Sequence, residues 1–126
     1  MAKIYRILFI DDEKIITSMA EIFLESAGFE VEAFNDHTAA LEVFMLDPAR
    51  FHLVVTDQTM RGATGMEIAA KIKAVRPAIP IIMITGYHGN LTATKAKEAG
   101  INQILYKPVV PRDLALAIRK ELDAEG

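Results

Sequence analysis

The sequence predicts one α/β domain in which a parallel five-stranded sheet lies between two layers of helices. The first observation is the length, because 126 residues suit one domain and leave little room for a second. The second is an alternation between short strand-like apolar runs and segments with helical spacing. The third is that the segments 4–10 and 51–56 are too continuously apolar for half-solvated strands, as in strands covered on both faces. Alternating strands and helices imply right-handed crossovers, so we expect residues 1–126 to form a single three-layer domain.

The first half of the chain contains three predicted strands and two predicted helices. In the first helix, Ile15, Met19, Ile22 and Phe23 recur at helical spacing, and Gly28 follows as the C-cap. The segment after this glycine alternates apolar and polar residues, which indicates an edge strand. The expected strands are 4–10, 29–34 and 51–56, and the expected helices are 14–27 and a segment capped by Asp36 that ends near Asp47.

The second half repeats the pattern after a glycine-containing loop at 61–65. In the last helix, Leu114, Ile118 and Leu122 have the spacing of an inward face. The expected helices are 66–75, 91–99 and 112–122, and the expected strands are 79–85 and 101–106.

The composition excludes several classes of function. Lys and Arg number 14 and Asp and Glu number 17, so the net charge of −3 argues against a nucleic-acid-binding surface. The chain has no cysteine, which excludes disulfides, thiol nucleophiles and Cys-based zinc sites and suits a reducing cytoplasm. No apolar run approaches the ~18 residues of a membrane span, and the N-terminus lacks the regions of a signal peptide. We therefore expect a cytoplasmic protein that contacts neither membrane nor nucleic acid directly.

Polar residues follow four of the five predicted strands. The first strand is followed by Asp11-Asp12-Glu13, the third by Asp57, the fourth ends in Thr85, and the fifth is followed by Lys107. The end of the second strand, Asn35-Asp36, shows no comparable pattern. In a parallel sheet all carboxyl ends lie at one edge, where ligands bind.

A flavodoxin-like strand order of 2-1-3-4-5 places the first and third strands side by side. Asp12 and Asp57 then face one another, and such closely packed carboxylates require a cation. A hard divalent ion such as Mg²⁺ fits oxygen ligands. With Lys107 and the Thr85 hydroxyl, the predicted site suits a phosphoryl group.

Each of these residues also has a purely structural interpretation. A single Asp after a strand is most often a helix N-cap, and Glu13 is favourably placed in a first helical turn. Thr85-Gly86 and Lys107-Pro108 resemble ordinary strand exits. The structural interpretation becomes improbable only for the set, because all these residues fall at one edge of the sheet.

The ordered set resembles the receiver domain of two-component response regulators over nearly the whole chain. The motifs are Asp11-Asp12-Glu13, Asp57 with Met60 three residues and Gly65 eight residues later, Thr85-Gly86, and Lys107-Pro108. The resemblance implies that Asp57 is the phosphoacceptor and that Lys107 holds the phosphoryl oxygens while Thr85 responds to them. Asp12 is then the main Mg²⁺ carboxylate, Asp11 assists through water, and the backbone carbonyl of Thr59 completes the metal's protein ligands with Asp57. Mn²⁺ is expected to substitute for Mg²⁺.

The resemblance also implies partners. The phosphodonor is a histidine kinase or a histidine phosphotransfer domain, and a downstream partner binds the face of helix 4, strand 5 and helix 5. The chain is expected to be a signalling receiver in a phosphorelay that catalyses its own phosphorylation and slow dephosphorylation, and not an enzyme that turns over substrate. The peptide before Pro108 is expected to be cis, as is common in this family.

Three positions depart from the family pattern. Arg61 stands where a proline is usual, and Thr64 replaces a frequent acidic residue with little expected chemical effect. Ile104 takes the place of an aromatic residue that changes rotamer on activation, so weaker coupling to the output face is expected. Tyr106 is aromatic but is predicted to lie on the strand face opposite Lys107.

Three other functions compete with this interpretation. An aspartyl-phosphate phosphatase carries a second acid two residues after its nucleophile, where this chain has Thr59. A flavin or nucleotide binder needs a Gly/Ser/Thr-rich phosphate loop after strand 1, and the acids found there are electrostatically wrong. The receiver portion of a hybrid histidine kinase would share the biochemistry and differ only in context.

Overall fold

A computed structural model describes residues 3–86 and 91–124 and confirms the predicted sheet. Five strands run parallel in the order β2-β1-β3-β6-β7, which is the 2-1-3-4-5 order of a flavodoxin-like fold. The first and third strands are therefore neighbours. The strands are β1 (Arg6–Ile10), β2 (Glu30–Phe34), β3 (Leu53–Asp57), β6 (Ile81–Thr85) and β7 (Gln103–Tyr106).

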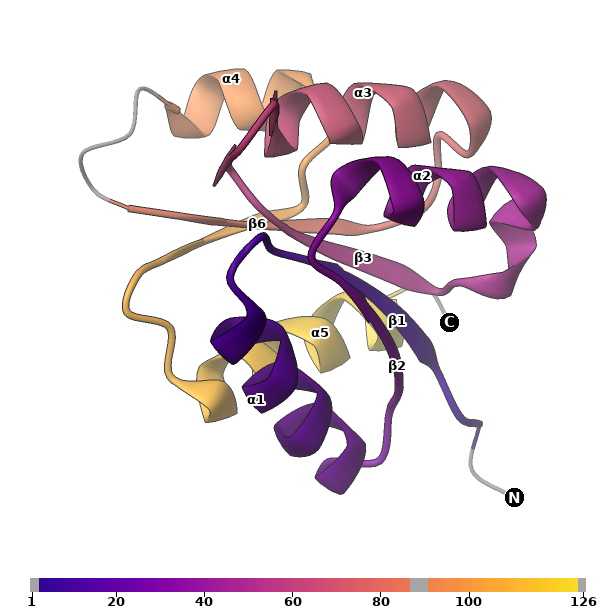
Figure 1. The fold of residues 1–126 in the computed structure, drawn as a ribbon, viewed down its shortest axis with the longest axis vertical. Coiled ribbons are helices and arrows are strands. Elements are labelled where there is room, and N and C mark those ends of the chain that lie inside the picture. The colour runs from indigo at the N-terminus through magenta and orange to yellow at the C-terminus, as the bar shows by residue number, and fades with distance from the viewer. Residues whose placement is uncertain (1–2, 87–90, 125–126) are drawn as a thin grey trace.

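Helices cover both faces of the sheet (Figure 1). One face carries α2 (His37–Leu46), α3 (Gly65–Val75) and α4 (Ala93–Glu98), and the other carries α1 (Lys14–Ser26) and α5 (Pro111–Ala124). The successive apolar residues of β1 are explained by cores on both faces of the sheet. Ile7 and Phe9 enter the core beneath α1 and α5, whereas Leu8 and Ile10 enter the core beneath the other three helices.

Two short features were not predicted from the sequence. A 3₁₀ turn, Pro48–Arg50, follows α2, and a small hairpin forms between β4 (Thr59–Met60) and β5 (Ala63–Thr64). Gly62, at the tip of this hairpin, has a φ of 81°, a conformation that favours glycine. The hairpin replaces the predicted open loop directly after the last residue of β3.

The apolar spacing in α1 does not mark the helix face that packs on the core. Ile15, Met19 and Ile22 are 74%, 57% and 72% exposed, respectively. The buried residues are the smaller Thr17 and Ala20 together with Leu24, which lie roughly on the opposite side of a helix with 3.6 residues per turn. Helix α1 is apolar on two sides, so periodicity alone could not decide which side faces inward.

The remaining helices agree with the sequence apart from their ends. Leu114, Ile118 and Leu122 of α5 are buried as predicted, and α4 is shorter than expected. Among the described residues, no helix combines the length and the apolarity needed to cross a membrane.

Candidate phosphoacceptor and cation site

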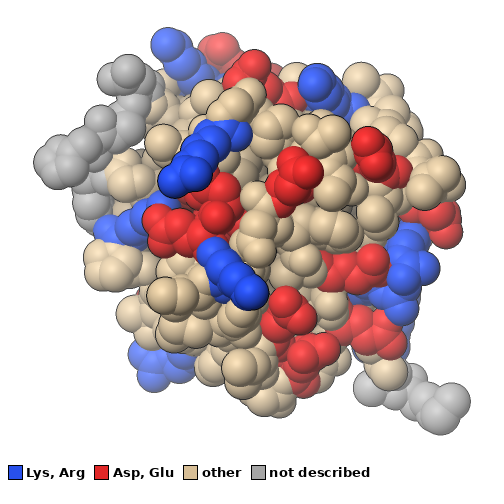
Figure 2. Space-filling model, viewed as in Figure 1, with Lys and Arg blue, Asp and Glu red and all other residues tan. Residues whose placement is uncertain are grey.

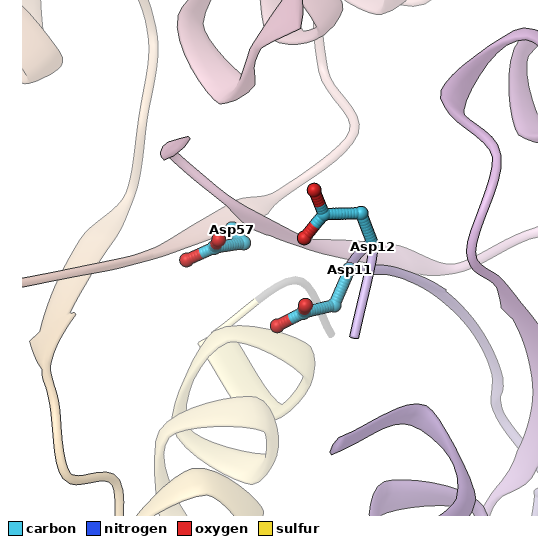
Figure 3. A group of neighbouring side chains, drawn as sticks. All are labelled: Asp11, Asp12 and Asp57. Atoms are coloured by element: carbon cyan, nitrogen blue, oxygen red, sulfur yellow. The ribbon is translucent and has the colours of Figure 1, made fainter. Parts of the chain in front are cut away.

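Three carboxylates meet where the two central strands end. Asp11 and Asp12 directly follow β1, and Asp57 is the last residue of β3. These strands are paired, with Ile10 opposite Thr56, so the acids arrive at the same height. One carboxylate oxygen from each acid lies within 4.8 Å of the others. Figure 3 shows Asp11 and Asp12 turned toward the end of β3 that carries Asp57. The predicted convergence of these acids is confirmed.

Two of these carboxylates are almost completely buried. Asp11 is 1% exposed and Asp57 is 2% exposed. Burial disfavours a charged carboxylate, and it raises the pKa of Asp11 to about 6. Burial likewise raises the pKa of Asp57 above its ordinary value, although Lys107 opposes the shift. The negative charge at this edge is therefore held at an electrostatic cost.

Lys107 supplies the positive charge that the sequence predicts. It follows β7, its peptide bond to Pro108 is cis, and its Nζ lies 2.9 Å from Oδ1 of Asp57. Burial opposes the charge of this ammonium, but the facing carboxylates of Asp57 and Asp11 outweigh it and raise the Lys107 pKa. Apart from this ion pair, no donor among the described residues makes a hydrogen bond to the buried Oδ1 of Asp57. Figure 2 shows acidic side chains gathered with basic ones beside them on the face in view.

Thr85 and Thr59 occupy different positions around the acids. Thr85 ends β6, the strand next to β3, and is 2% exposed. Among the described residues, its hydroxyl makes a single long bond, of 3.4 Å, to the carbonyl of Gly86. Thr59 lies in β4 and lines an open cleft together with Asp12. That its carbonyl is a metal ligand stays a prediction.

The short segment that carries Asp11 and Asp12 is tied down from outside. The amide Nδ2 of Asn35 donates to the carbonyl of Asp11 at 2.9 Å, and the backbone N–H of Arg61 donates to Oδ2 of Asp12 at 3.0 Å. Asn35 carries no pattern that predicts this role, and Arg61 stands out in the sequence only because it replaces the usual proline. A proline at 61 has no N–H to give, so the departure itself creates the second bond.

Helix α3 begins in close contact with the end of β3. A Cβ on Gly65 would lie 2.6 Å from the carbonyl oxygen of Asp57 and 2.4 Å from Sδ of Met83, so a side chain there has no room. Thr64 is the N-cap, and it forms a reciprocal capping box with Glu67. Thr64, for which little chemical effect is expected, therefore has a structural role. The spacing Thr-x-x-Glu before an apolar helix was the signal available for it.

Ile104 and Tyr106 lie beside α4, away from the acids. Both line a groove that also includes Ala96 and Ile101. Lys107 does not line this groove, in agreement with its predicted placement on the other face of the strand.

The donor set fits a hard divalent cation. Carboxylate oxygens are the ligands that Mg²⁺ takes in proteins, and three of them converge here. Beside its ion pair with Lys107, Oδ1 of Asp57 accepts no hydrogen bond from the described residues, so this carboxylate oxygen is available to a cation.

Comparisons with known proteins agree with this geometry. A family model described as the response regulator receiver domain matches residues 7–119. The chain is 36% identical over 108 residues to the uncharacterized transcriptional regulatory protein YesN of Bacillus subtilis, a match that covers 82% of this chain and 28% of YesN. It is 28% identical over 117 residues to the DNA-binding response regulator MtrA of Mycolicibacterium paratuberculosis, covering 93% of this chain and 51% of MtrA.

A solved structure shows the same likeness in three dimensions. A response regulator receiver domain protein from Clostridium thermocellum superposes with a TM-score of 0.90 at 32% identity, and the match covers 96% of each chain. The chain thus spans about a quarter to a half of the length of the two curated relatives and nearly all of the solved receiver domain.

Proposed function

The chain belongs to the response regulator receiver family of two-component systems, and we propose that it accepts a phosphoryl group on Asp57 in a reaction that requires Mg²⁺. The observation that carries this proposal is the convergence of Asp11, Asp12 and Asp57 with the ammonium of Lys107. Structural capping explains single acids at strand ends. It does not explain why two of these acids are buried against each other with one lysine.

The chemistry assigned to Asp57 is nucleophilic. A carboxylate oxygen of Asp57 attacks phosphorus, and the bond between phosphorus and the donor's imidazole nitrogen breaks. The nitrogen keeps the electron pair, and an aspartyl phosphate results. Lys107, 2.9 Å from Asp57, is placed to bind a phosphoryl oxygen, and the poorly bonded Thr85 hydroxyl is free to donate to one.

Asp11 and Asp12, with Asp57 and the Thr59 carbonyl, would hold Mg²⁺ or Mn²⁺. The ion supplies positive charge against the phosphoryl oxygens, which is the main requirement of phosphoryl transfer. Thr59 stands where a phosphatase of the aspartyl-phosphate type carries its second acid. We therefore propose that the chain catalyses its own phosphorylation and slow dephosphorylation without turning over phosphate esters.

The apolar surface of α1 supports a protein as the phosphodonor. Ile16 and Val109 line two adjoining grooves. One runs along the exposed residues Met19 and Ile22 of α1, and the other reaches Lys107 and the buried Asp11. A histidine kinase or histidine phosphotransfer domain seated on the first groove would bring its phosphohistidine to the second.

The output surface is proposed on other grounds. The groove beside Ile104 and Tyr106 lies between α4 and β7 and is separate from the α1 surface, so a downstream partner can bind there. That this chain binds neither membrane nor nucleic acid directly, and that it is cytoplasmic, stay predictions.

The central test is labelling of Asp57. Wild-type protein and the Asp57→Asn variant are treated with acetyl phosphate and Mg²⁺, and incorporation is followed by intact-protein mass spectrometry. We expect one acid-labile phosphate on wild type and none on the variant. Asp36→Asn is the matched control, because Asp36 is an exposed acid at the same edge and Asn retains its N-cap function. Stoichiometric labelling of Asp57→Asn would overturn the assignment.

A second measurement separates the phosphatase alternative. Wild-type protein incubated with p-nitrophenyl phosphate is expected to release no more nitrophenol than the Asp57→Asn variant under the same conditions. Multiple turnover by wild type alone would favour the enzyme.

A further inference from the structure

Asn35 belongs to a strand end that contributes no acid to the site. It directly follows β2, and its Nδ2 donates two bonds of 2.9 Å, one to the backbone carbonyl of Asp11 and one to Oγ1 of Thr17. The orientation of the amide is fixed by chemistry, because a carbonyl can only accept and therefore must face the NH₂ group.

These two bonds clamp both ends of the segment that carries the acids. Asp11-Asp12-Glu13 connects β1 to α1. The Asp11 carbonyl lies at its start, and Thr17 lies in the first turn of the helix that follows. Thr17 is 3% exposed, and its hydroxyl also donates to the carbonyl of Lys14 at 3.0 Å. The Asn35 amide thus joins the end of one element to the beginning of the next.

The other bonds of this segment do not replace the clamp. The Asp11 N–H donates to the carbonyl of Phe34 at 3.1 Å, and the Asp11 carboxylate accepts from the N–H of Glu13 at 2.9 Å. Among the hydrogen bonds of the described residues, Asn35 supplies the one side chain from outside the segment that bonds to the segment's backbone. Without it, the Asp11 carbonyl loses its side-chain donor, and the mutual repulsion of the carboxylates is opposed by fewer contacts.

We propose that Asn35 is a positioning residue that holds Asp11 and Asp12 at the spacing a divalent cation requires. This inference rests on the proposed function, since it concerns the same cation. The physical reason is preorganisation: a carboxylate that is already in place does not have to be drawn in by the ion. Groups that orient metal ligands in this way typically change metal affinity by about 10–100-fold when removed.

The test compares two asparagines next to strand ends: Asn35 directly follows β2, and Asn102 directly precedes β7. Asn102 bonds the N–H of Ile81 through Oδ1 at 3.0 Å, far along the chain from the acids and near the start of β6. Mg²⁺ binding is measured by isothermal titration calorimetry, and unfolding by urea, for wild type, Asn35→Ala and Asn102→Ala. Both variants lose a side-chain bond to the backbone. We expect only Asn35→Ala to bind Mg²⁺ about tenfold more weakly, with Asn102→Ala within twofold of wild type.

A second pair of variants keeps the proposal testable if Asn35→Ala does not fold. Thr17→Val removes the hydroxyl that accepts from Asn35 at nearly constant volume, whereas Thr17→Ser retains it. Weaker Mg²⁺ binding is expected for Thr17→Val, and wild-type binding for Thr17→Ser. Equal Mg²⁺ affinity of wild type, Asn35→Ala and Thr17→Val would overturn the role of Asn35.

If the proposed function itself is wrong, the experiment gives a different result. In that case wild type itself binds neither Mg²⁺ nor beryllofluoride, whatever residue is at position 35. A loss of stability in Asn35→Ala with an unchanged Mg²⁺ affinity would show that the clamp is only structural and would likewise overturn the inference.

Discussion

The two edges of the sheet treat charge in opposite ways. At the amino edge, where the strands begin, Arg6 pairs with Glu30 and Glu32, and Glu32 also pairs with Arg50. At the carboxyl edge three acids converge with Lys107 paired to only one of them. The amino-edge groups are partly exposed and each pairs with a group of opposite charge, whereas Asp11 and Asp57 are buried and their pKa values are raised by that burial.

This difference indicates where the molecule is built for stability and where for function. A partly exposed pair such as Arg6 and Glu30 contributes little to stability because solvent screens the attraction, but these pairs leave no charge unbalanced. The carboxyl edge keeps an imbalance that folding alone would not favour. The carboxyl edge lowers the stability of the folded protein, and it has the oxygen donors that a divalent cation needs. We therefore expect binding of such a cation there to stabilise the folded protein.

The largest expected effect comes from removing a cation at the amino edge. Nη1 of Arg76 donates to the carbonyl of Pro48 at 2.6 Å and also to that of Phe51. Arg76→Ala leaves both carbonyls without this donor, so we expect the free energy of unfolding to fall by about 2–3 kcal/mol, the usual range for bonds from a charged group. Urea unfolding checks this value. Lys71→Ala, which removes an exposed cation from the same helix, is the control and should change little; equal effects of the two substitutions would break the comparison.

Removing a charge at the carboxyl edge is expected to have the opposite sign. Asp11→Asn keeps the Oδ1 acceptor for the Glu13 N–H and removes a buried charge. The folded-state pKa of Asp11, about 6, lies above its ordinary value of 3.8, so the folded protein binds more protons between these values. Wild type therefore loses stability as the pH rises through that window. At pH 7 without metal, we expect Asp11→Asn to be more stable by about 1–3 kcal/mol.

The control for this gain is again Asp36→Asn, which changes an exposed N-cap acid and should leave stability nearly unchanged. Addition of Mg²⁺ sharpens the test, because wild type should gain stability from the ion and Asp11→Asn should gain less. A variant that is less stable than wild type at pH 7 without metal would show that the buried charge is not a burden.

The carboxyl-edge side of this comparison could be predicted from the sequence. The apolar spacing shows where each strand ends, and the ends of parallel strands lie at one edge of the sheet. Asp11, Asp12, Asp57 and Lys107 each follow an apolar run, so a parallel sheet necessarily brings them to one edge. The strand order was taken from a flavodoxin-like sheet, and it was this order that predicted that Asp12 and Asp57 face each other. These predictions needed no knowledge of side-chain packing.

The features that were missed depend on contacts between distant segments. The spacing of Ile15 and Ile22 predicts a buried helix face, but the smaller Thr17 and Ala20 are buried instead. Only the packing of α1 against the rest of the protein determines which face is buried. Asn35 carries no signal in its own neighbourhood, since both of its acceptors belong to other elements.

The smallest expected effect concerns His52 at the amino edge. The N–H of Arg6 donates to Nδ1 of His52 at 2.9 Å, which requires that nitrogen to be unprotonated, and the ring of Tyr5 packs against the imidazole at 5.2 Å between centroids. Burial lowers the pKa of His52, and the nearby cations Lys3, Arg76 and Arg6 lower it further. The folded state therefore binds fewer protons than the unfolded state just below the ordinary histidine value of 6.5.

It follows that the contribution of His52 to stability is present above pH 6.5 and is lost as the pH falls through its folded-state pKa. This is opposite to the trend from Asp11, so the pH profile of wild type alone would mix the two edges. His52→Gln removes the titration and keeps an amide oxygen that can accept from Arg6. We expect wild type to lose more unfolding free energy than His52→Gln between pH 7 and pH 5. A pH-independent difference for His52→Gln would mean that this histidine is not held neutral by its surroundings, and the amino edge would lose its one predicted sensitivity to acid.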